Sequence, residues 1–511
     1  MNKTTKAISV VTILLLISKP FGFIREMIVA AYYGATYQTD AYNMAINIIG
    51  LSTAIISAGI ATVIIPMYNH KRIQQTKPEA DLFANNILWI TSLFYIVVSI
   101  LGIIFAPVLI KIFAPKFEGE IVALTVNIIR ILFIFTVFVN ISNYMTAIAK
   151  IYDKFAITVI SNYPITILTV VFTVLFSQHI GIYALVASYI LFLVVHALIL
   201  IFSVRKVFNF KVIINFTNGD FINVVKLSLP IYLNVAVGEI NAVIDKMFAS
   251  GLSEGSISAI NYAKRLRALP EGIITTSIIT VMYPLLSKYA AEKDFSKMKA
   301  AATKAISLLF IALLPVIAVS LYYSKEITKI VYERGAFTPE TTALTANIFI
   351  YAIISMIFAG SANMLSNSFY SMQDTKTPQI ATIIMVACNI ALNFVLVRHM
   401  QAAGLTLATS IAYFVYFVIL FILFRRKCGA FGGLSLFKNI AKCVVATASM
   451  IPIFLLCELL RSRLPLFVFF VASVAASLCI YALLLYILRV DLFMEALNRA
   501  KAFLKKKFET K

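Results

Sequence analysis

The sequence predicts an all-α membrane protein that crosses the bilayer about fourteen times. Hydrophobic residues make up 61% of the 511 positions, and charged residues only 13%, about half the share expected of a soluble domain. Mean hydropathy is accordingly high, at +0.93. Apolar runs of roughly 20 residues, each long enough to cross a hydrocarbon core about 30 Å thick, recur along the chain. A soluble enzyme is therefore excluded.

Each predicted span is an apolar run bounded by polar breaks. The spans cover residues 8–32, 41–66, 84–113, 122–148, 155–177, 180–203, 222–249, 257–286, 302–322, 342–371, 378–397, 403–424, 438–458 and 465–488. The connections on the outer side are short, so none of them can house a catalytic domain.

A weak internal repeat groups these spans. Shifting the chain by about 218 positions superimposes span two on span eight and keeps their direction, which is typical of transporters with parallel repeats. Residues Thr62, Val63 and Pro66 fall on Thr280, Val281 and Pro284. We therefore expect two pseudo-symmetric six-helix lobes, residues 1–204 and 221–424, followed by two additional spans in 438–488.

The basic residues indicate the orientation. The formal net charge is +22, and most basic residues outside the spans fall in the even-numbered connections and in both tails. By the positive-inside rule both termini are cytoplasmic. The C-terminal tail, 489–511, has an amphipathic basic pattern that suits a surface of anionic phospholipids. In so apolar a chain this charge does not indicate nucleic-acid binding.

The cysteines and histidines predict no redox or metal centre. Five cysteines lie in or beside apolar stretches, without the spacing of a disulfide scaffold or a zinc site. None of the four histidines has a Cys, Asp or Glu partner at metal-ligand spacing. We expect no cofactor.

The first predicted span contains charges that are costly inside a membrane. Lys19 and Arg25 stand near Glu26, around Pro20. The two basic side chains either reach toward an interface and pair with Glu26, or form an anion site. The sequence leaves both explanations open.

The eighth predicted span carries a second basic group. Lys264, Arg265 and Arg267 precede Glu271, so a local salt bridge with Glu271 or Glu254 competes with a second half of the anion site. Arginine suits a diphosphate because its rigid fork donates two parallel hydrogen bonds.

Three further charged positions have structural explanations that compete with functional ones. Arg130 and Glu239 could form a pair between the lobes. Asp245 is expected to pair with Lys246.

Four stretches resemble the MurJ (MviN) lipid II flippases of the multidrug/oligosaccharidyl-lipid/polysaccharide exporter superfamily. They are SKPFGFIRE at 18–26, YYGATYQTDAY at 32–42, FASGLSEGSISAINYAKRL at 248–266 and FYSMQDTKTP at 369–378. The resemblance follows the family's order and spacing along nearly the whole chain. It implies fourteen spans, two lobes and a cationic central cavity, in agreement with the charges and the repeat.

The resemblance also implies a function. Members of this family export lipid II, an undecaprenyl-diphosphate disaccharide-pentapeptide, to the outer leaflet of the bacterial inner membrane, so cell-wall synthesis proteins are expected partners. By motif position, Arg25 and Arg265 match arginines that bind the diphosphate. Lys19 matches another such position as lysine. Asp40, which we include in the predicted substrate-binding site, matches an acidic position near the outer end of span one.

Two departures from the family pattern affect the expected site. The family often has arginine and glutamate in the second span, where this chain reads IIGLSTAIISAG. Lys264, which we include in the predicted site, stands where many members have an acidic residue. Asp245 and Asp374 match acidic positions of a sodium site found in some members, but Tyr370 stands where an amide ligand would help.

The expected mechanism is alternating access, in which no bond is made or broken. Sodium or the membrane potential could bias the cycle. The competing functions are a flippase for another polyprenyl-diphosphate glycan, a multidrug exporter of the same superfamily, a membrane enzyme and an inert scaffold. An enzyme would require paired carboxylates or a histidine-based constellation on an outer loop, which the sequence does not offer.

Overall fold

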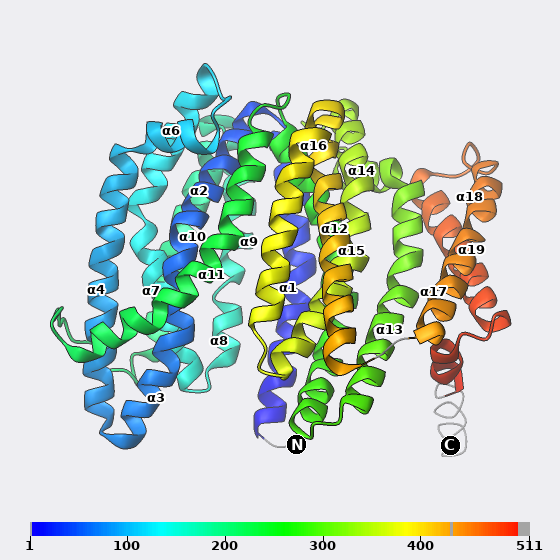
Figure 1. Cartoon of the computed structure of the whole chain (residues 1–511). Coiled ribbons are helices and arrows are strands. Elements are labelled where there is room, and N and C mark those ends of the chain that lie inside the picture. Colours follow the sequence, from blue (N-terminus) through cyan, green and yellow to red (C-terminus); the bar gives the residue numbers. More distant parts are fainter. Residues whose placement is uncertain (1–2, 430–432, 499–511) are drawn as a thin grey trace, which may run out of the picture. The chain divides into compact units, whose positions relative to one another are not determined.

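The computed structural model describes residues 3–429 and 433–498, and in these residues the secondary structure is helical (Figure 1). By contacts, the chain divides into two compact units. Unit 1 comprises Met1–Ala259 and Arg334–Thr341, and unit 2 comprises Ile260–Glu333 and Thr342–Lys511. The predicted all-α fold is confirmed.

Unit 1 is a bundle of helices joined by short turns. Its helices are α1 (Lys3–Tyr33), α2 (Tyr37–Gly59), the π-helix η1 (Ile60–Ile64), α3 (Ile65–Gln74), α4 (Lys77–Ile104), α5 (Ala106–Phe113), α6 (Glu120–Ile134), α7 (Thr136–Ile151), α8 (Phe155–Ile160), α9 (Tyr163–Ile180), α10 (Tyr183–Val204) and α11 (Gly219–Ala249). Helix α1 packs against α9, α2 against α6 and α11, and α10 against α7 and α9.

Unit 2 contains the rest of the chain. Its helices are α12 (Ser256–Ala291), whose first turn belongs to unit 1, α13 (Phe295–Tyr322), α14 (Ser324–Tyr332), α15 (Pro339–Ser371), α16 (Lys376–Cys428), α17 (Gly433–Ala448), α18 (Met450–Glu458) and α19 (Leu466–Ile487). Helices α13, α17 and α19 pack together around a core that includes Tyr323, Phe454 and Phe469.

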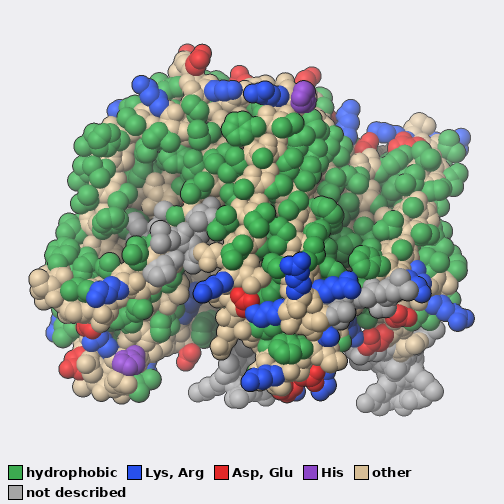
Figure 2. All heavy atoms as spheres, viewed as in Figure 1, with side chains coloured by type: hydrophobic (Ala, Val, Ile, Leu, Met, Phe, Trp, Pro, Cys, Tyr) green, Lys and Arg blue, Asp and Glu red, His purple; other side chains and the backbone are tan. Residues whose placement is uncertain are grey.

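The apolar helices fit a multi-pass membrane protein. Among the described residues, nine helices are long and apolar enough to cross a membrane, or up to eleven if each of two bent pairs forms one span. The number fourteen stays a prediction. Helix α16 enters this count once, although Gln401 has non-helical backbone angles that divide it between predicted spans eleven and twelve. Hydrophobic side chains cover the middle of the visible surface, and charges gather mainly toward its ends (Figure 2).

Two predicted spans are bent. Helix α2 continues through η1 into α3, and α6 meets α7 at Phe135, each with a bend of 46°. A π-helical turn loosens the regular hydrogen-bond ladder and is often found at functional sites. Gly59, directly before η1, lies against the ring of Tyr232 on α11, where a larger side chain would collide. The bend of the second span falls between Ala54 and Ser57 of α2, ahead of this π-helical turn.

The contact-based units differ from the predicted lobes in their boundary. Helix α11, the predicted first span of the second lobe, belongs to unit 1 because it packs against α2, α5 and η1. The lobes defined by the repeat remain a prediction.

The start of the predicted amphipathic tail packs against unit 2. Residues 491–498 are helical, Phe493 contacts the core around Tyr323, and Glu495 pairs with Lys304 at 2.9 Å. The lysine-rich remainder, 499–511, lies outside the described residues.

Candidate functional site

The basic residues of the first span lie on one continuous helix. Pro20 stands inside α1 without ending it. Lys19 is exposed. Arg25 donates a hydrogen bond of 2.5 Å to Glu26, and these two side chains are only 15% and 16% exposed. The pairing of Arg25 with Glu26 is thus present, but it uses one of the five N–H donors of the guanidinium.

The second basic group lies on α12, beyond its first turn and within unit 2. Lys264 and Arg265 are exposed. Arg267 forms a salt bridge of 3.0 Å with Glu271 and donates a hydrogen bond to Ser355 of α15. The local salt bridge considered for this cluster is therefore correct for Arg267. The binding roles of Lys264 and Arg265 stay a prediction.

Asp40 is buried, and its side chain holds the start of α12. It is 3% exposed. Its carboxylate accepts hydrogen bonds from the backbone N–H of Gly255 at 2.8 Å, from that of Ser258 at 2.7 Å and from the Ser258 hydroxyl at 2.6 Å. The first N–H groups of a helix have no partner within it, and the helix dipole favours a negative charge there. Asp40 therefore caps α12 from a different helix.

Other contacts extend this arrangement into what we call the turn junction, formed by residues 31–43, 250–258 and 334–337. The backbone N–H of Tyr37 donates to Glu254 at 3.0 Å, and the Asn43 amide donates to Ser258 at 3.1 Å. The backbone N–H of Ala336 donates to the carbonyl of Ala31 at 2.7 Å. Three turns that are distant in sequence thus meet within unit 1.

Glycine makes this close approach feasible. Gly255 and Gly335 have φ angles of +79° and +57°, and a Cβ on either would collide with the carbonyl oxygen of Ala35 or Ala31. Residues with a side chain rarely adopt this left-handed backbone. The junction therefore depends on glycine for both conformation and space.

A polar cavity of about 310 Å³ adjoins the turn junction. It lies between α2, the start of α6 and the turn before α12, and its charged lining consists of Asp40, Lys116, Glu118, Glu120 and Glu254. Four of these five side chains are acidic. This cavity does not have the charge that a diphosphate requires.

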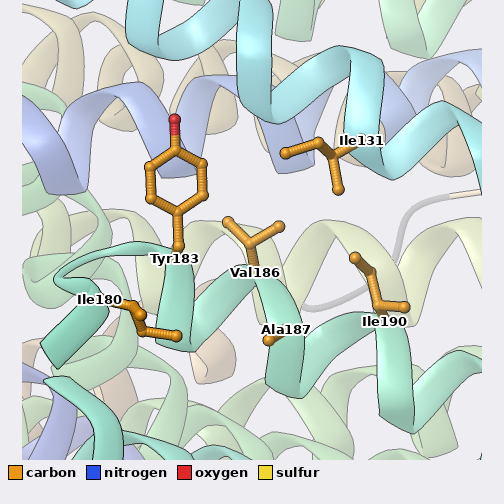
Figure 3. A pocket seen from close by; sticks show the side chains of 6 residues that line it. All are labelled: Ile131, Ile180, Tyr183, Val186, Ala187 and Ile190. Carbon is orange, nitrogen blue, oxygen red and sulfur yellow. The ribbon is translucent and has the colours of Figure 1, made fainter.

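A second cavity, of about 390 Å³, is apolar. Figure 3 shows its lining, which comes from α6, the end of α9 and α10. It consists of Ile131, Ile180, Tyr183, Val186, Ala187 and Ile190. A lining with one hydroxyl group suits hydrocarbon and offers no ligand for a phosphate.

The two acidic residues of the predicted sodium site lie in different units. Asp245 is partly buried on α11 of unit 1. Asp374 precedes α16 in unit 2, where Lys427 forms a salt bridge with it and Thr377 donates two hydrogen bonds, of 3.0 Å and 2.8 Å. Burial alone would raise the pKa of Asp374, but these hydrogen bonds outweigh it and hold the pKa below its ordinary value. Within the described residues, no group of three or more His, Cys, Asp or Glu side chains is placed to hold a metal ion.

Among the described residues, Arg130 forms no salt bridge with Glu239, the partner considered for it. Its Nε donates to the backbone carbonyl of Ile103 at 3.3 Å, joining α6 to α4. A carbonyl at the end of a neighbouring helix is not recognisable as a partner in the sequence. Sequence reasoning likewise missed Gly255 and Ser258, the partners of Asp40, although serine near the start of a helix is an N-terminal signal.

Most of the chain matches a known protein family. A family model described as "Lipid II flippase MurJ" matches residues 29–476. The chain belongs to the MurJ family.

Relatives in this family match most of the chain at moderate identity. "Probable lipid II flippase MurJ" of Rickettsia prowazekii is 29% identical over 408 residues, covering 79% of this chain and 80% of that protein. The protein with the same description from Thermotoga maritima is 26% identical over 500 residues, covering 94% and 96%.

Solved structures share the fold. "Lipid II flippase MurJ, inward closed conformation" superimposes with a TM-score of 0.80 at 24% identity, covering 94% of this chain and 99% of that one. An inward-facing multidrug resistance MATE transporter of the MOP superfamily superimposes with a TM-score of 0.65 at 15% identity, covering 83% and 98%. The MurJ family and the apolar helices identify a multi-pass membrane protein of a transporter family.

Proposed function

We propose that this protein is a flippase that moves lipid II from the inner to the outer leaflet of the bacterial cytoplasmic membrane. The observation that carries the proposal is the match of the MurJ family model to residues 29–476. The relatives from Rickettsia prowazekii and Thermotoga maritima are described by the same activity. In this proposal both termini face the cytoplasm, as the distribution of basic residues favours.

The proposed binding group for the diphosphate is basic. Arg25 of α1 and Arg265 of α12 supply guanidinium groups, which bind phosphate oxygens through two parallel hydrogen bonds. Lys19 and Lys264 add positive charge without that geometry. All four lie on helices in an apolar chain, where charged side chains are rare and mark pathways for charged substrates.

The proposed transport cycle is alternating access. The bound diphosphate crosses while its polyprenyl tail remains in lipid, and the turn junction opens on the outer side to release the headgroup. Opening would require Asp40 to leave the start of α12, so the three hydrogen bonds it accepts would favour the closed junction. We propose the membrane potential, or sodium bound through Asp245 or Asp374, as the source of directionality.

The proposal is tested in a bacterium depleted of its own lipid II flippase. The chain is expressed as wild type, Arg25→Ala and Arg265→Ala at matched membrane levels, and survival and outer-leaflet lipid II are scored. Wild type is expected to restore both, and each variant to lose at least about 100-fold of the transport rate, because a bidentate contact to a charged group is removed.

A matched control separates loss of the binding group from general damage. Arg130→Ala removes an arginine from α6 that donates a hydrogen bond to the backbone carbonyl of Ile103, and it should transport at nearly the wild-type rate. Rescue by all variants would retain transport but discard the site. Failure of well-expressed wild type to move lipid II would discard the proposed cargo.

A flippase for another polyprenyl-diphosphate glycan is the second candidate. It is favoured by the uncharged middle of α2, where Thr53 and Ser57 donate hydrogen bonds to carbonyls of their own helix. Purified protein should then bind an undecaprenyl-diphosphate with a different glycan more tightly than lipid II. A multidrug exporter, suggested by the MATE fold similarity, would instead raise resistance to cationic drugs.

A further inference from the structure

The segment between α10 and α11 is held against α4 by side chains of one helical face. Asp81, Asn85 and Trp89 recur every four residues along α4, and Asn86 lies beside them. The first two and Asn86 are almost completely buried. We call residues 208–216 the strap, since they run along this face without regular secondary structure.

The hydrogen bonds between α4 and the strap reach its backbone at three odd-numbered residues, Asn209, Lys211 and Asn215. Asn85 donates to the carbonyl of Asn209 at 2.7 Å and accepts from the N–H of Lys211 at 2.9 Å. Trp89 donates to the carbonyl of Lys211 at 2.9 Å. Asn86 both accepts from and donates to the backbone of Asn215, at 2.6 Å and 3.0 Å.

This pattern determines where the side chains of the strap lie. In an extended chain the N–H and C=O of every second residue point to the same edge, and side chains alternate between the two faces. Asn209, Lys211 and Asn215 use their backbone to bind α4. The even-numbered side chains therefore share one face, and those after Phe208 are 41% exposed for Phe210, 72% for Val212, 49% for Ile214 and 52% for Phe216.

We propose that this apolar face inserts into the inner leaflet of the membrane, at the boundary between lipid headgroups and acyl chains. The strap is bound to α4, a candidate membrane span, on which Leu82, Leu93 and Phe94 are also exposed. Trp89, the one tryptophan of the chain, is a residue typical of this boundary. The inner side follows from the topology in the proposed function.

The charges of the strap region favour an anionic lipid surface. Arg205, Lys206 and Lys211 are exposed, and basic residues beside an apolar face bind membranes that contain anionic lipids. At the far end, Asp220 pairs with Lys71 at 2.9 Å, which fixes the start of α11 to α3. The strap thus attaches the chain between α10 and α11 both to α4 and to the lipid.

The test is a cysteine scan of residues 209–216 with a nitroxide label, in full-length protein whose five native cysteines have been replaced. The protein is reconstituted in vesicles of phosphatidylethanolamine and phosphatidylglycerol. Replacing side chains at 209, 211 and 215 keeps the backbone bonds to α4. We expect the accessibility to oxygen relative to a water-soluble nickel chelate to be severalfold higher at 210, 212, 214 and 216 than at the odd positions.

Ile73→Cys is the matched control, because this isoleucine is 82% exposed near the end of α3 beside basic residues, and its label should contact water. Equal accessibility at even and odd positions, or protection of the even positions from both probes, would overturn the insertion. Replacing phosphatidylglycerol with neutral phosphatidylcholine should make the label at 212 shallower, and an unchanged depth would overturn the electrostatic contribution. Since no substrate is present, failure of the proposed transport activity would leave these results unaffected.

Discussion

Asp40 and Arg25 are two charged residues on consecutive helices of the same apolar chain, and their surroundings differ. Asp40 is nearly inaccessible and accepts three hydrogen bonds from the start of α12. Arg25 is partly exposed and contacts the neighbouring Glu26. Because protein N–H and O–H groups donate to the Asp40 carboxylate, Asp40 stabilises the fold. The contact with Glu26 uses one of the five N–H donors of the Arg25 guanidinium. The other donors suit it to bind an anionic ligand.

The comparison separates residues of the turn junction from residues of the proposed binding group. Changes at the junction should primarily alter stability and the ease of opening. Changes at the basic residues should primarily alter transport. Variants of the two groups can break that separation, and the largest effect is expected at Asp40.

Replacing Asp40 with alanine should destabilise the protein by about 3 kcal/mol, because it leaves buried N–H groups of α12 unpaired and removes a helix cap. Thermal unfolding of the purified protein in detergent measures this change. Ser258→Ala, which removes one of the three donors, should cost about 1 kcal/mol. If Asp40→Ala were as stable as wild type but defective in transport, Asp40 would belong to the proposed binding group that contains Arg25.

Replacing Gly255 with alanine should cost about 2 kcal/mol, because the left-handed backbone is strained and the new Cβ collides with the carbonyl of Ala35. Gly181→Ala is the control. Gly181 also has a positive φ, but nothing lies within 4 Å of its Cβ position, so only about 1 kcal/mol of strain is expected. Equal melting temperatures of the two variants would contradict a tightly closed junction.

Replacing Arg25 with lysine should reduce lipid II transport about tenfold while leaving thermal stability unchanged, because lysine keeps the charge but not the bidentate geometry. The rate is measured in vesicles that contain purified protein. The reciprocal variant Lys19→Arg should transport at least as fast as wild type. A fall in stability at Arg25→Lys without a fall in rate would make the Arg25–Glu26 contact structural.

The smallest effect is expected at Asp374, whose lowered pKa makes its contribution dependent on pH. A carboxyl group with a lowered folded-state pKa stabilises the protein above its ordinary pKa of 3.8, and this contribution is lost as the pH falls through the lower folded value. Asp374→Asn should therefore be less stable than wild type at pH 6, by less than roughly 1 kcal/mol. The difference should shrink below pH 4, and melting curves at both pH values measure it. If the difference in stability between Asp374→Asn and wild type were the same at both pH values, the effect would come from altered hydrogen-bond geometry and not from the charge of Asp374.

Parts of the candidate site were predictable from local sequence. The cost of charge inside a membrane singled out Lys19, Arg25 and Arg265, and family motifs assigned them a role. The pairing of Arg267 with Glu271 was also within reach, because residues four apart lie on one helical face. The partners of Asp40 were not, since they lie more than 200 positions away.

The sequence by itself determined the all-α membrane fold and the family, because hydropathy, charge and short motifs are properties of neighbouring residues. Only the tertiary structure decided that Asp40 caps α12, that α11 groups with unit 1 and that α4 binds the strap through its backbone. Those outcomes depend on which distant groups satisfy each buried donor and acceptor, and a backbone amide leaves no signature in the sequence.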